Sequence, residues 1–576
     1  MKSVTHITLF FILIWLGSAI EPCKVLILDA HNLSNTSPMD YPPAYQTMSQ
    51  LADDLSYIMS SPDGATCKEL GVMVYPGNYI IDDQFSFDGN QNSYSLIFNT
   101  SADYVRIIFT FKDQSNLRFQ NFAHLRIQSV SLEFHTQSMN SFTITDPSEV
   151  IITNMDTSES QPNLEGSQMR IRSVNKLIID SMKINSLLSP IFLEINGQYA
   201  TIGLINITNL IIEYAVTEEY QDLRPTYSGF GALFVNSSSV LTITNLSVIS
   251  PRDSTTNLPI RTSFLGQILQ IFNSIDVSIR GFYARELDSY YYGYWGKIHN
   301  IAKLTLGNIN FTQNTLQSSQ LYSMFDIQNV NDTSIQDVEI SHNSIQPEEK
   351  SDTICFFKFT MPNVRYGKIV MKDLLFTNMS QAKLLLAVGE FLDFNISNAA
   401  FTKLTIRQYN NLIEIETSHQ NTDAFHSWFK GPLTSQSNLE NILFDDISLE
   451  SSELMHFEHT IKSQPILYLT PEEKVIANLN NITFSRIIAG PVAGQSDKDF
   501  YNGFARFDQV KGVIRQSTLS NSIFSHRHFI YSVEESSLIV DNLTVVNTIV
   551  EVSIISQYGR RDSTKQLYPP DEFSIT

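Results

Sequence analysis

The chain has 576 residues, and its 38 Lys and Arg against 59 Asp and Glu leave a formal net charge of -21. Only 17% of the residues are charged, below the roughly 25% of an ordinary soluble domain, whereas 43 are Asn and 107 are Ser or Thr. At 42% hydrophobic, the chain can bury a large core, which excludes global disorder. The negative charge argues against nucleic acid as a partner, because binding to a phosphate backbone requires a basic surface.

The first 19 residues are predicted to be a secretory signal peptide. A lysine precedes a run of ten residues at positions 7–16 that are apolar except for Thr8, and Gly17-Ser18-Ala19 offers the small residues that favour cleavage near Ile20. An uncleaved anchor is the alternative, but a run of ten residues falls short of the roughly 20 that a spanning helix needs. We expect a secreted, extracellular protein with no membrane span in the mature chain. A fragment of a longer protein with an anchor beyond Thr576 remains the other interpretation.

Three cysteines fit an oxidising compartment loosely. Cys23 and Cys67 both lie in the N-terminal part and are candidates for a disulfide, and Cys355, in an apolar run, is expected to be a buried free thiol. No two cysteines have metal-ligand spacing, so the cysteines give no support for a zinc site. We expect no metal site and no cofactor.

A recurring pattern is the strongest feature of the sequence. The template is apolar, x, apolar, x, a small turn-forming residue, apolar, x, apolar, as in Leu241–Val248 and Leu538–Val545. Asn, Asp, Ser and Gly suit the turn position because they tolerate a left-handed backbone or bond to it. The predicted turn positions are Ser129, Asn154, Ser181, Asn206, Asn245, Gly281, Asn308, Asp337, Asp373, Asn398, Asp446, Asn481 and Asn542. One degraded repeat near Ser517 brings the prediction to about 14 coils.

A second short apolar strand precedes the template strand, as at Gly231–Val235, Ile354–Phe357 and Phe529–Val533. Short strands of period two without an intervening helical pattern predict an all-β solenoid of parallel strands. A leucine-rich repeat lacks support because its Leu-x-x-Leu-x-Leu spacing is absent, and spacings of about 25 residues are too short for propeller blades.

The N-terminal region is predicted to cap the solenoid. Apolar residues between Thr47 and Met59 form one face of a short helix, and Val72–Ile80 reads as a strand, a Pro-Gly turn and a strand. Here the chain resembles the pectin-lyase-like right-handed parallel β-helix proteins, over about residues 45 to 550. The resemblance implies a single-stranded right-handed parallel β-helix with an N-terminal helix and strand cap. The predicted parts are a cap with the first coils at 20–110, the helix at 111–550 and a C-terminal tail at 551–576.

Twelve Asn-x-Ser/Thr sequons predict glycosylation. Four of them, Asn206, Asn245, Asn481 and Asn542, coincide with predicted turn positions, where side chains in an interior ladder could not carry a glycan. The remaining eight are the predicted glycosylation sites: Asn32, Asn35, Asn99, Asn236, Asn310, Asn331, Asn378 and Asn395.

The family resemblance also implies that the chain could be an enzyme. Its galacturonase-like hydrolases use an Asn-Thr-Asp motif, an Asp-Asp pair, a Gly-His-Gly and an Arg-x-Lys, which bring carboxylates to one glycosidic bond. Asn421-Thr422-Asp423 followed by Asp445 and Asp446 matches the first two. The other two are absent, since His456 and His459 lack flanking glycines and Arg486 stands alone. Asp423, Asp445 and Asp446 therefore remain catalytic candidates without the rest of the motif, and we expect Asp423 and Asp446 on different corners.

One segment favours glycan binding. Residues 281–296 concentrate aromatic side chains, which stack on sugar rings; the candidate binding residues are Tyr290, Tyr291, Tyr292, Tyr294 and Trp295. The alternative is that these rings pack against the solenoid. The sequence favours a non-catalytic adhesive or carbohydrate-binding protein, with extracellular polysaccharide or surface glycans as partners. The alternative is a divergent glycoside hydrolase or polysaccharide lyase of the same fold.

Overall fold

The computed structural model describes most of the chain in segments. They are residues 22–29, 44–61, 66–91, 93–100, 107–112, 114–135, 141–160, 167–187, 191–197, 201–214, 231–250, 263–264, 267–290, 295–318, 323–347, 354–361, 367–380, 382–389, 392–407, 411–419, 434–461, 474–490, 504–508, 510–525, 528–533, 536–551, 553–558 and 573–575. The chain forms two compact units, one of Met1–Ala215 with Ala232–Leu241 and the other of Val216–Gly231 with Thr242–Thr576.

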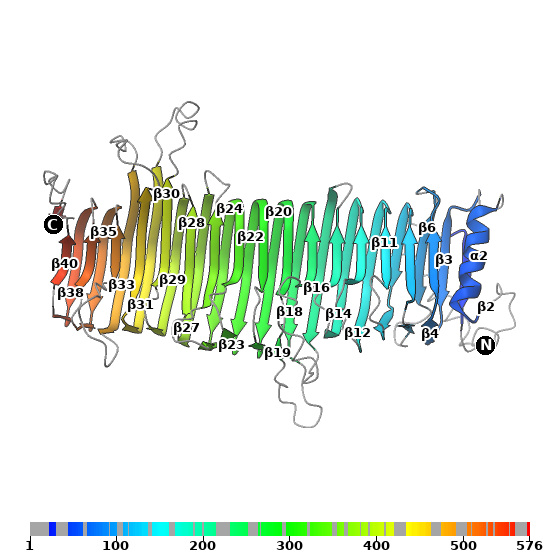
Figure 1. Ribbon diagram of the computed structural model, residues 1–576, viewed down its shortest axis with the longest axis horizontal. Helices are drawn as coiled ribbons and strands as arrows, with labels where there is room; N and C mark the ends of the chain where they lie inside the picture. The colour runs from blue at the N-terminus through cyan, green and yellow to red at the C-terminus, as the bar shows by residue number, and fades with distance from the viewer. Residues whose placement is uncertain are drawn as a thin grey trace, which may run out of the picture. The chain divides into compact units, whose positions relative to one another are not determined.

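The first unit begins with a capping helix, α2 (Met48–Ser60), which packs against the first strands (Figure 1). Thr47 is its N-cap in a capping box with Gln50, so two backbone N–H groups that lack helical partners are satisfied. The buried face consists of the apolar residues that the sequence pattern indicates: Met48, Leu51, Ala52, Leu55, Ile58 and Met59. The predicted cap is therefore confirmed.

The strands of the first unit pair in parallel, each with a strand one coil further along the chain. They are β1 (Lys24–Leu28), β2 (Ala44–Tyr45), β3 (Glu69–Val74), β4 (Gly77–Ile81), β5 (Gln84–Asp88), β6 (Ser95–Thr100), β7 (Ile107–Phe111), β8 (Asn116–Gln120), β9 (His124–Gln128), β10 (Ser131–Phe134), β11 (Phe142–Thr145), β12 (Glu149–Glu159), β13 (Ser167–Arg172), β14 (Lys176–Leu187), β15 (Ile191–Asn196), β16 (Ile202–Tyr214) and β17 (Gly231–Asn236). The next strand, β18 (Ser238–Ile249), crosses the boundary between the units.

The second unit is built in the same way, and its described strand pairs are also parallel. Its strands are β19 (Ser263–Phe264), β20 (Gln267–Arg285), β21 (Asp288–Tyr290), β22 (Gly296–Thr312), β23 (Thr315–Ser318), β24 (Ser323–Ser341), β25 (Ser344–Pro347), β26 (Ile354–Met361), β27 (Gly367–Ser380), β28 (Ala382–Gly389), β29 (Leu392–Arg407), β30 (Asn411–His419), β31 (Thr434–Glu450), β32 (Glu453–Ile461), β33 (Lys474–Gly490), β34 (Ala505–Asp508), β35 (Lys511–Ser520), β36 (Ile523–Phe524), β37 (His528–Val533), β38 (Ser537–Val546), β39 (Ile549–Val550), β40 (Ser553–Tyr558) and β41 (Phe573–Ile575).

Identical side chains stack inside the coils because parallel in-register pairing places equivalent positions over one another. In the second unit, Phe376, Phe401, Phe444 and Phe484 form one such column, with ring centroids 5.6, 5.1 and 5.2 Å apart. Outward positions alternate with these buried ones. An all-β parallel β-helix is thereby confirmed as the fold. Two strands, β40 and β41, lie within the predicted tail and pair with β37 and β38.

The corners of the coils carry residues with a left-handed backbone. The predicted turn positions have a positive φ with the exception of Asn206, where the corner residue is Asn209 instead. On β31, the residue that aligns with the corner Asn398 of the neighbouring coil is Asn441, not the predicted Asp446. Asp446 also has a positive φ of 57°, but it lies at the next corner, in register with Lys403 and Arg486. The predicted alignment of Asp446 with the other turn positions was wrong. One coil has two left-handed corners, one at each end of a short strand, and the alternating sequence template fits either corner.

Asparagine side chains link successive corners. Asn441 donates to Oδ1 of Asn398 at 3.3 Å and accepts from Asn481 at 2.8 Å. These side chains are exposed, so the expectation that such ladders lie in the interior was wrong. The amides cross from coil to coil on the surface because the side chain at a left-handed corner points away from the core.

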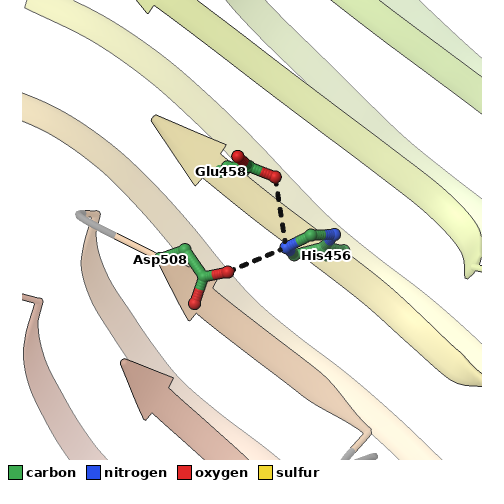
Figure 2. A group of neighbouring side chains, drawn as sticks. All are labelled: His456, Glu458 and Asp508. Atoms are coloured by element: carbon green, nitrogen blue, oxygen red, sulfur yellow. Dashed lines mark hydrogen bonds and ion pairs between the residues drawn. The ribbon is translucent and has the colours of Figure 1, made fainter. Parts of the chain in front are cut away.

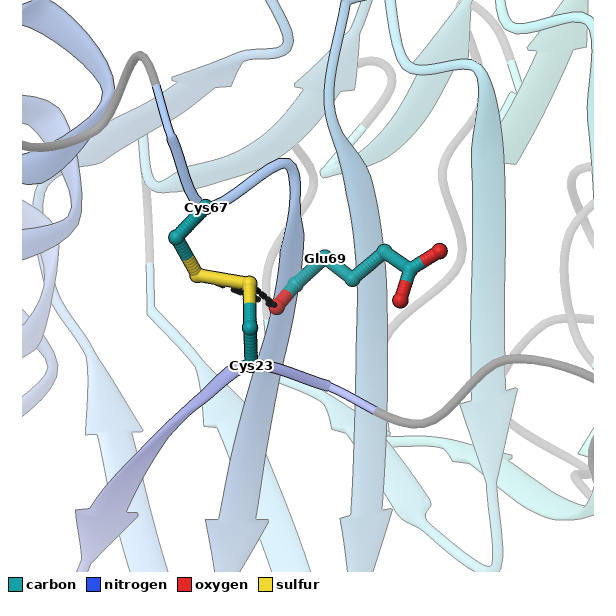
Figure 3. Close-up of a disulfide and its surroundings, with 3 residues drawn as sticks. All are labelled: Cys23, Cys67 and Glu69. Atoms are coloured by element: carbon teal, nitrogen blue, oxygen red, sulfur yellow. Dashed lines mark hydrogen bonds between the residues drawn. A yellow bond between two sulfur atoms is a disulfide. The ribbon is translucent and has the colours of Figure 1, made fainter.

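A disulfide joins the start of β1 to the segment before β3. The Sγ atoms of Cys23 and Cys67 are bonded, and the backbone oxygen of Glu69 lies 3.3 Å from Sγ of Cys23 (Figure 3). Cys355 is a buried free thiol on β26, and burial raises its pKa to about 12.

Candidate functional site

Charged residues gather on the outward side of four successive strands of the second unit, β28, β30, β32 and β34. Because strands alternate their side chains, Glu414 and Glu416 face outward together, as do His456 and Glu458. Register places Glu414 beside His456 and His456 beside Arg506. A second row runs from Glu416 through Glu458 to Asp508. We call Lys383, Glu414, Glu416, Glu453, His456, Glu458, Arg506 and Asp508 the charged cluster.

His456 contacts three carboxylates of this cluster, and two of them, Glu458 and Asp508, are drawn with it in Figure 2. Its Nε2 is 3.3 Å from Oδ2 of Asp508 and 3.8 Å from Oε2 of Glu458, and its Nδ1 is 4.0 Å from Oε1 of Glu414. The His456 side chain is only 10% exposed. The imidazole thus has three carboxylates around it and little contact with solvent.

Two cations complete the cluster. The ammonium group of Lys383 pairs with Oε2 of Glu414, and Nη2 of Arg506 lies 2.7 Å from Oδ2 of Asp508. Both ion pairs are largely shielded from water, with Glu414 and Asp508 side chains 15% and 14% exposed. Shielded pairs of this kind interact more strongly than ion pairs in open solvent.

The surroundings of the carboxyl groups lower the pKa values of some of them and raise those of others. Burial works against ionisation of Glu414 and Asp508, but Lys383 lowers the pKa of Glu414, and His456 with Arg506 lowers that of Asp508. Burial and a hydrogen bond with Glu414 raise the pKa of Glu416 to about 7. Groups with pKa values moved apart in this way are typical of functional sites.

Glu453 and His456 complete the electrostatics. Burial raises the pKa of Glu453, which is 4% exposed, to about 7. Burial disfavours the charged form of His456, but the hydrogen bond with Asp508 and the charge of Glu453 outweigh it and raise its pKa. The cluster can therefore exchange protons near neutral pH, and His456, Glu458 and Asp508 also place three metal-ligating atoms within 4.8 Å of one another.

The two rows of the charged cluster continue toward the start of the second unit. On β20, β22, β24, β26 and β28 the in-register outward residues are Gln270 and Phe272, Lys297 and His299, Asp326 and Gln328, Lys358 and Thr360, and Leu386 and Val388. We call these ten residues and the row members Glu414, Glu416, His456, Glu458, Arg506 and Asp508 the polar strip. Asp326, 1% exposed, accepts from Nε2 of Gln328 at 3.0 Å and lies 3.1 Å from Nε2 of His299. The strip thus holds shielded charges well beyond the charged cluster.

Asp445 and Asp446, two of the three catalytic candidates from the sequence, are not part of this site. Asp445 on β31 pairs with Arg486, whose Nε is 2.9 Å from Oδ1, and this hydrogen bond lowers the pKa of Asp445. Asp446 occupies a corner, as described above. Asp423 lies outside the described residues, so its predicted separation from Asp446 stays a prediction.

The aromatic segment is divided by the structure. Trp295 was predicted to bind glycans, but it is 1% exposed and packs edge-on against Phe311 with ring centroids 4.9 Å apart. That prediction was wrong, because a ring enclosed by the core presents no face to a sugar. Tyr291, Tyr292, Tyr294 and the side chain of Tyr290 lie outside the described residues.

The predicted glycosylation sites differ in their surroundings. Asn331 and Asn378 are exposed, whereas Asn99 is half-buried. Three others are half-buried and hydrogen-bonded: Asn236 to Asn196 at 3.3 Å, Asn310 to Glu339 at 3.0 Å and Asn395 to Asn438 at 2.7 Å. Asn32 and Asn35 lie outside the described residues.

Sequence reasoning missed the charged cluster. It considered His456 only as part of a Gly-His-Gly motif. The structure instead gathers five carboxyl groups in one place. A signal was present in the alternation Ile413-Glu414-Ile415-Glu416 and His456-Phe457-Glu458, where charges occupy the outward positions of two strands in succession.

Among the described residues, no helix has the length and apolar character needed to cross a membrane.

Comparisons with known proteins assign no family to the chain. No family model matches the chain, and no curated protein matches it significantly. The catalytic domain of a GH87 alpha-1,3-glucanase in complex with nigerose is 10% identical over 90% of this chain and 70% of that one, with a TM-score of 0.22. A double mutant of the periplasmic alginate epimerase AlgG is 10% identical over 77% of each chain, with a TM-score of 0.18. At these scores the likenesses carry no functional argument, and the strand pairing of the chain itself makes it a parallel β-helix protein.

Proposed function

We propose that this chain binds an extended polysaccharide along the polar strip. The observation that carries the proposal is the in-register run of outward side chains on eight successive strands, from Gln270 and Phe272 to Arg506 and Asp508. Polar or charged side chains occur on seven of these strands, Leu386 and Val388 supply an apolar step on β28, and most members are half-buried, whereas Gln270, Asp326 and His456 are buried. With neighbouring strands about 4.8 Å apart, the strip extends over about 34 Å. A linear polymer of sugar rings requires donors, acceptors and apolar faces repeated along a line, and the strip supplies all three.

The proposal includes export from the cell. The predicted signal peptide supports it, as does the disulfide between Cys23 and Cys67, because disulfides persist mainly in oxidising compartments. Glycans on the exposed Asn331 and Asn378 are part of the same proposal.

Binding should depend on the lysines of the strip. We expect Lys297→Gln with Lys358→Gln to weaken binding of a glycan, first identified on a glycan array, by about 10-fold or more, since hydrogen bonds to charged groups contribute about 1.5–3 kcal/mol each. Calorimetric titration of the intact protein measures the change.

The matched control removes two lysines from another face. Lys303 and Lys372 are 59% and 53% exposed, and Lys303→Gln with Lys372→Gln changes the net charge equally. Equal weakening in both double variants, or failure of the intact protein to bind any glycan, would refute the proposed strip.

A second candidate function is cleavage of the bound polysaccharide. The observation that favours it is the approach of Glu458 and Asp508, whose nearest oxygens lie within 4.8 Å. Retaining glycosidases place their two carboxyl groups about 5 Å apart. We expect Glu458→Gln to lower the release of reducing ends at least about 100-fold, a larger loss than the weakening of binding that removal of one charge from the strip causes. A protein that binds but releases no products would retain the first function alone.

A further inference from the structure

We propose that His456, Glu458 and Asp508 bind one divalent transition-metal ion of the zinc type. Two ligands come from alternate positions on β32, and the third comes from β34, directly beside Glu458 (Figure 2). The site needs no polysaccharide and goes beyond the proposed function.

The donor atoms are already close to the spacing that such an ion requires. For bonds of about 2.1 Å and tetrahedral geometry, neighbouring ligand atoms lie about 3.4 Å apart. Nε2 of His456 is 3.3 Å from Oδ2 of Asp508 and 3.8 Å from Oε2 of Glu458. Small side-chain rotations therefore complete three corners of a tetrahedron and leave the fourth open to water or to an incoming ligand.

The donor set selects the class of metal. Calcium and magnesium prefer shells made entirely of oxygen, whereas an imidazole nitrogen with carboxylates suits zinc and its first-row neighbours. The side chains of His456 and Asp508 are shielded, at 10% and 14% exposed, whereas Glu458, at 37%, lies on the side of the site that faces solvent.

Two features of the surroundings indicate that Asp508 can accept a bound cation in addition to its ion pairs with protein side chains. Oδ1 of Asp508 is buried and has no hydrogen-bond donor among the described residues. Arg506 holds only Oδ2 of the same carboxylate, at 2.7 Å. Oδ2 of Asp508 can therefore ligate a metal ion and keep its ion pair with Arg506, because a carboxylate oxygen offers two lone pairs, and the unpaired Oδ1 is available for a second bond to the ion.

The balance of charge supports the same site. The three carboxyl groups nearest to His456, those of Glu414, Glu458 and Asp508, lie within 4.0 Å of its ring nitrogens, and the described cations paired with them are Lys383 and Arg506. With a neutral imidazole, which a metal ion requires, one negative charge is left over. Gathering acids in a shielded place is costly unless cations offset them. A divalent ion at His456 supplies two positive charges where the carboxylates converge.

Titration of the intact protein, freed of any affinity tag, with Zn²⁺ tests the site. We expect one ion bound per chain, with the affinity lowered at least about 100-fold by His456→Gln and at least about 10-fold by Asp508→Asn. Replacement with Co²⁺ should give the visible absorption typical of four-coordinate cobalt. Ca²⁺ should bind far more weakly than Zn²⁺.

His299→Gln is the matched control. His299 lies in the same strip and meets one carboxylate, Asp326, at 3.1 Å, with Gln328 as the neighbouring polar group, so it lacks a second carboxylate ligand. Zn²⁺ binding should be unchanged in this variant, and circular dichroism verifies that each variant is folded. Zinc stoichiometry that survives His456→Gln, or no binding by the unmodified protein, would overturn the proposal; neither result involves a glycan, so polysaccharide binding is judged separately.

Discussion

Replacing Trp295 with alanine should lower the free energy of unfolding of the second unit by about 3–5 kcal/mol. The ring is enclosed, at 1% exposed, and lies against Phe311. Truncation removes a large apolar surface and leaves a cavity that stacked strands cannot easily close, because each coil is held in register by its neighbours. Urea unfolding followed by circular dichroism measures the loss.

Tyr57→Ala is the control for this prediction, since Tyr57 is an aromatic residue on α2 that is 71% exposed. It should change stability by no more than about 0.5 kcal/mol. A Trp295→Ala protein of unaltered stability that had lost glycan binding would show that the ring meets the ligand, contrary to its position in the core.

Replacing both Cys23 and Cys67 with serine should destabilise the N-terminal cap by about 4 kcal/mol. This magnitude follows from the entropy of closing a loop between residues 44 positions apart. Because the bond ties the start of β1 to the segment before β3, the loss should be greatest for β1, β3 and α2. Amide hydrogen exchange, compared with the unmodified protein, locates it.

Cys355→Ala is the control for the disulfide. Cys355 is a buried free thiol, and replacing it with a residue of similar size should cost less than about 1.5 kcal/mol. Exchange rates in β1, β3 and α2 that match those of the unmodified protein after both serine substitutions would contradict the prediction.

Much of the architecture follows from local pattern. The apolar positions at Met48, Leu51 and Leu55 require a helical face, and the alternation in Leu241–Val248 requires a strand with one buried side. Small polar residues mark the corners because few other side chains tolerate a positive φ. These features depend on residues a few positions apart, so a single sequence exposes them.

Register is harder to predict than pattern. Asn206 and Asn209 both fit the template, and only pairing with the adjacent coil identifies Asn209, beside Ser181, as the corner. In the same way, Asn441 and Asp446 are both corners, and their alignment with Asn398 and Lys403 separates them. The sequence also did not reveal that the side chain of Trp295 points into the core, because composition identifies an aromatic residue but not which face of the sheet it lies on.

The sequence by itself determined a parallel β-helix with a helical cap, because its coils repeat a short-range rule at every turn. Only the tertiary structure assembled the charged cluster. His456 and Asp508 are 52 residues apart, and Lys383 and Glu414 are 31 apart. The connections between these strands differ in length. The strands nevertheless lie in register with one another, because backbone hydrogen bonds between neighbouring coils align them whatever the length of the connection. Distance along the chain therefore says little about which outward side chains meet, and the hydrogen-bonded register between coils decides it.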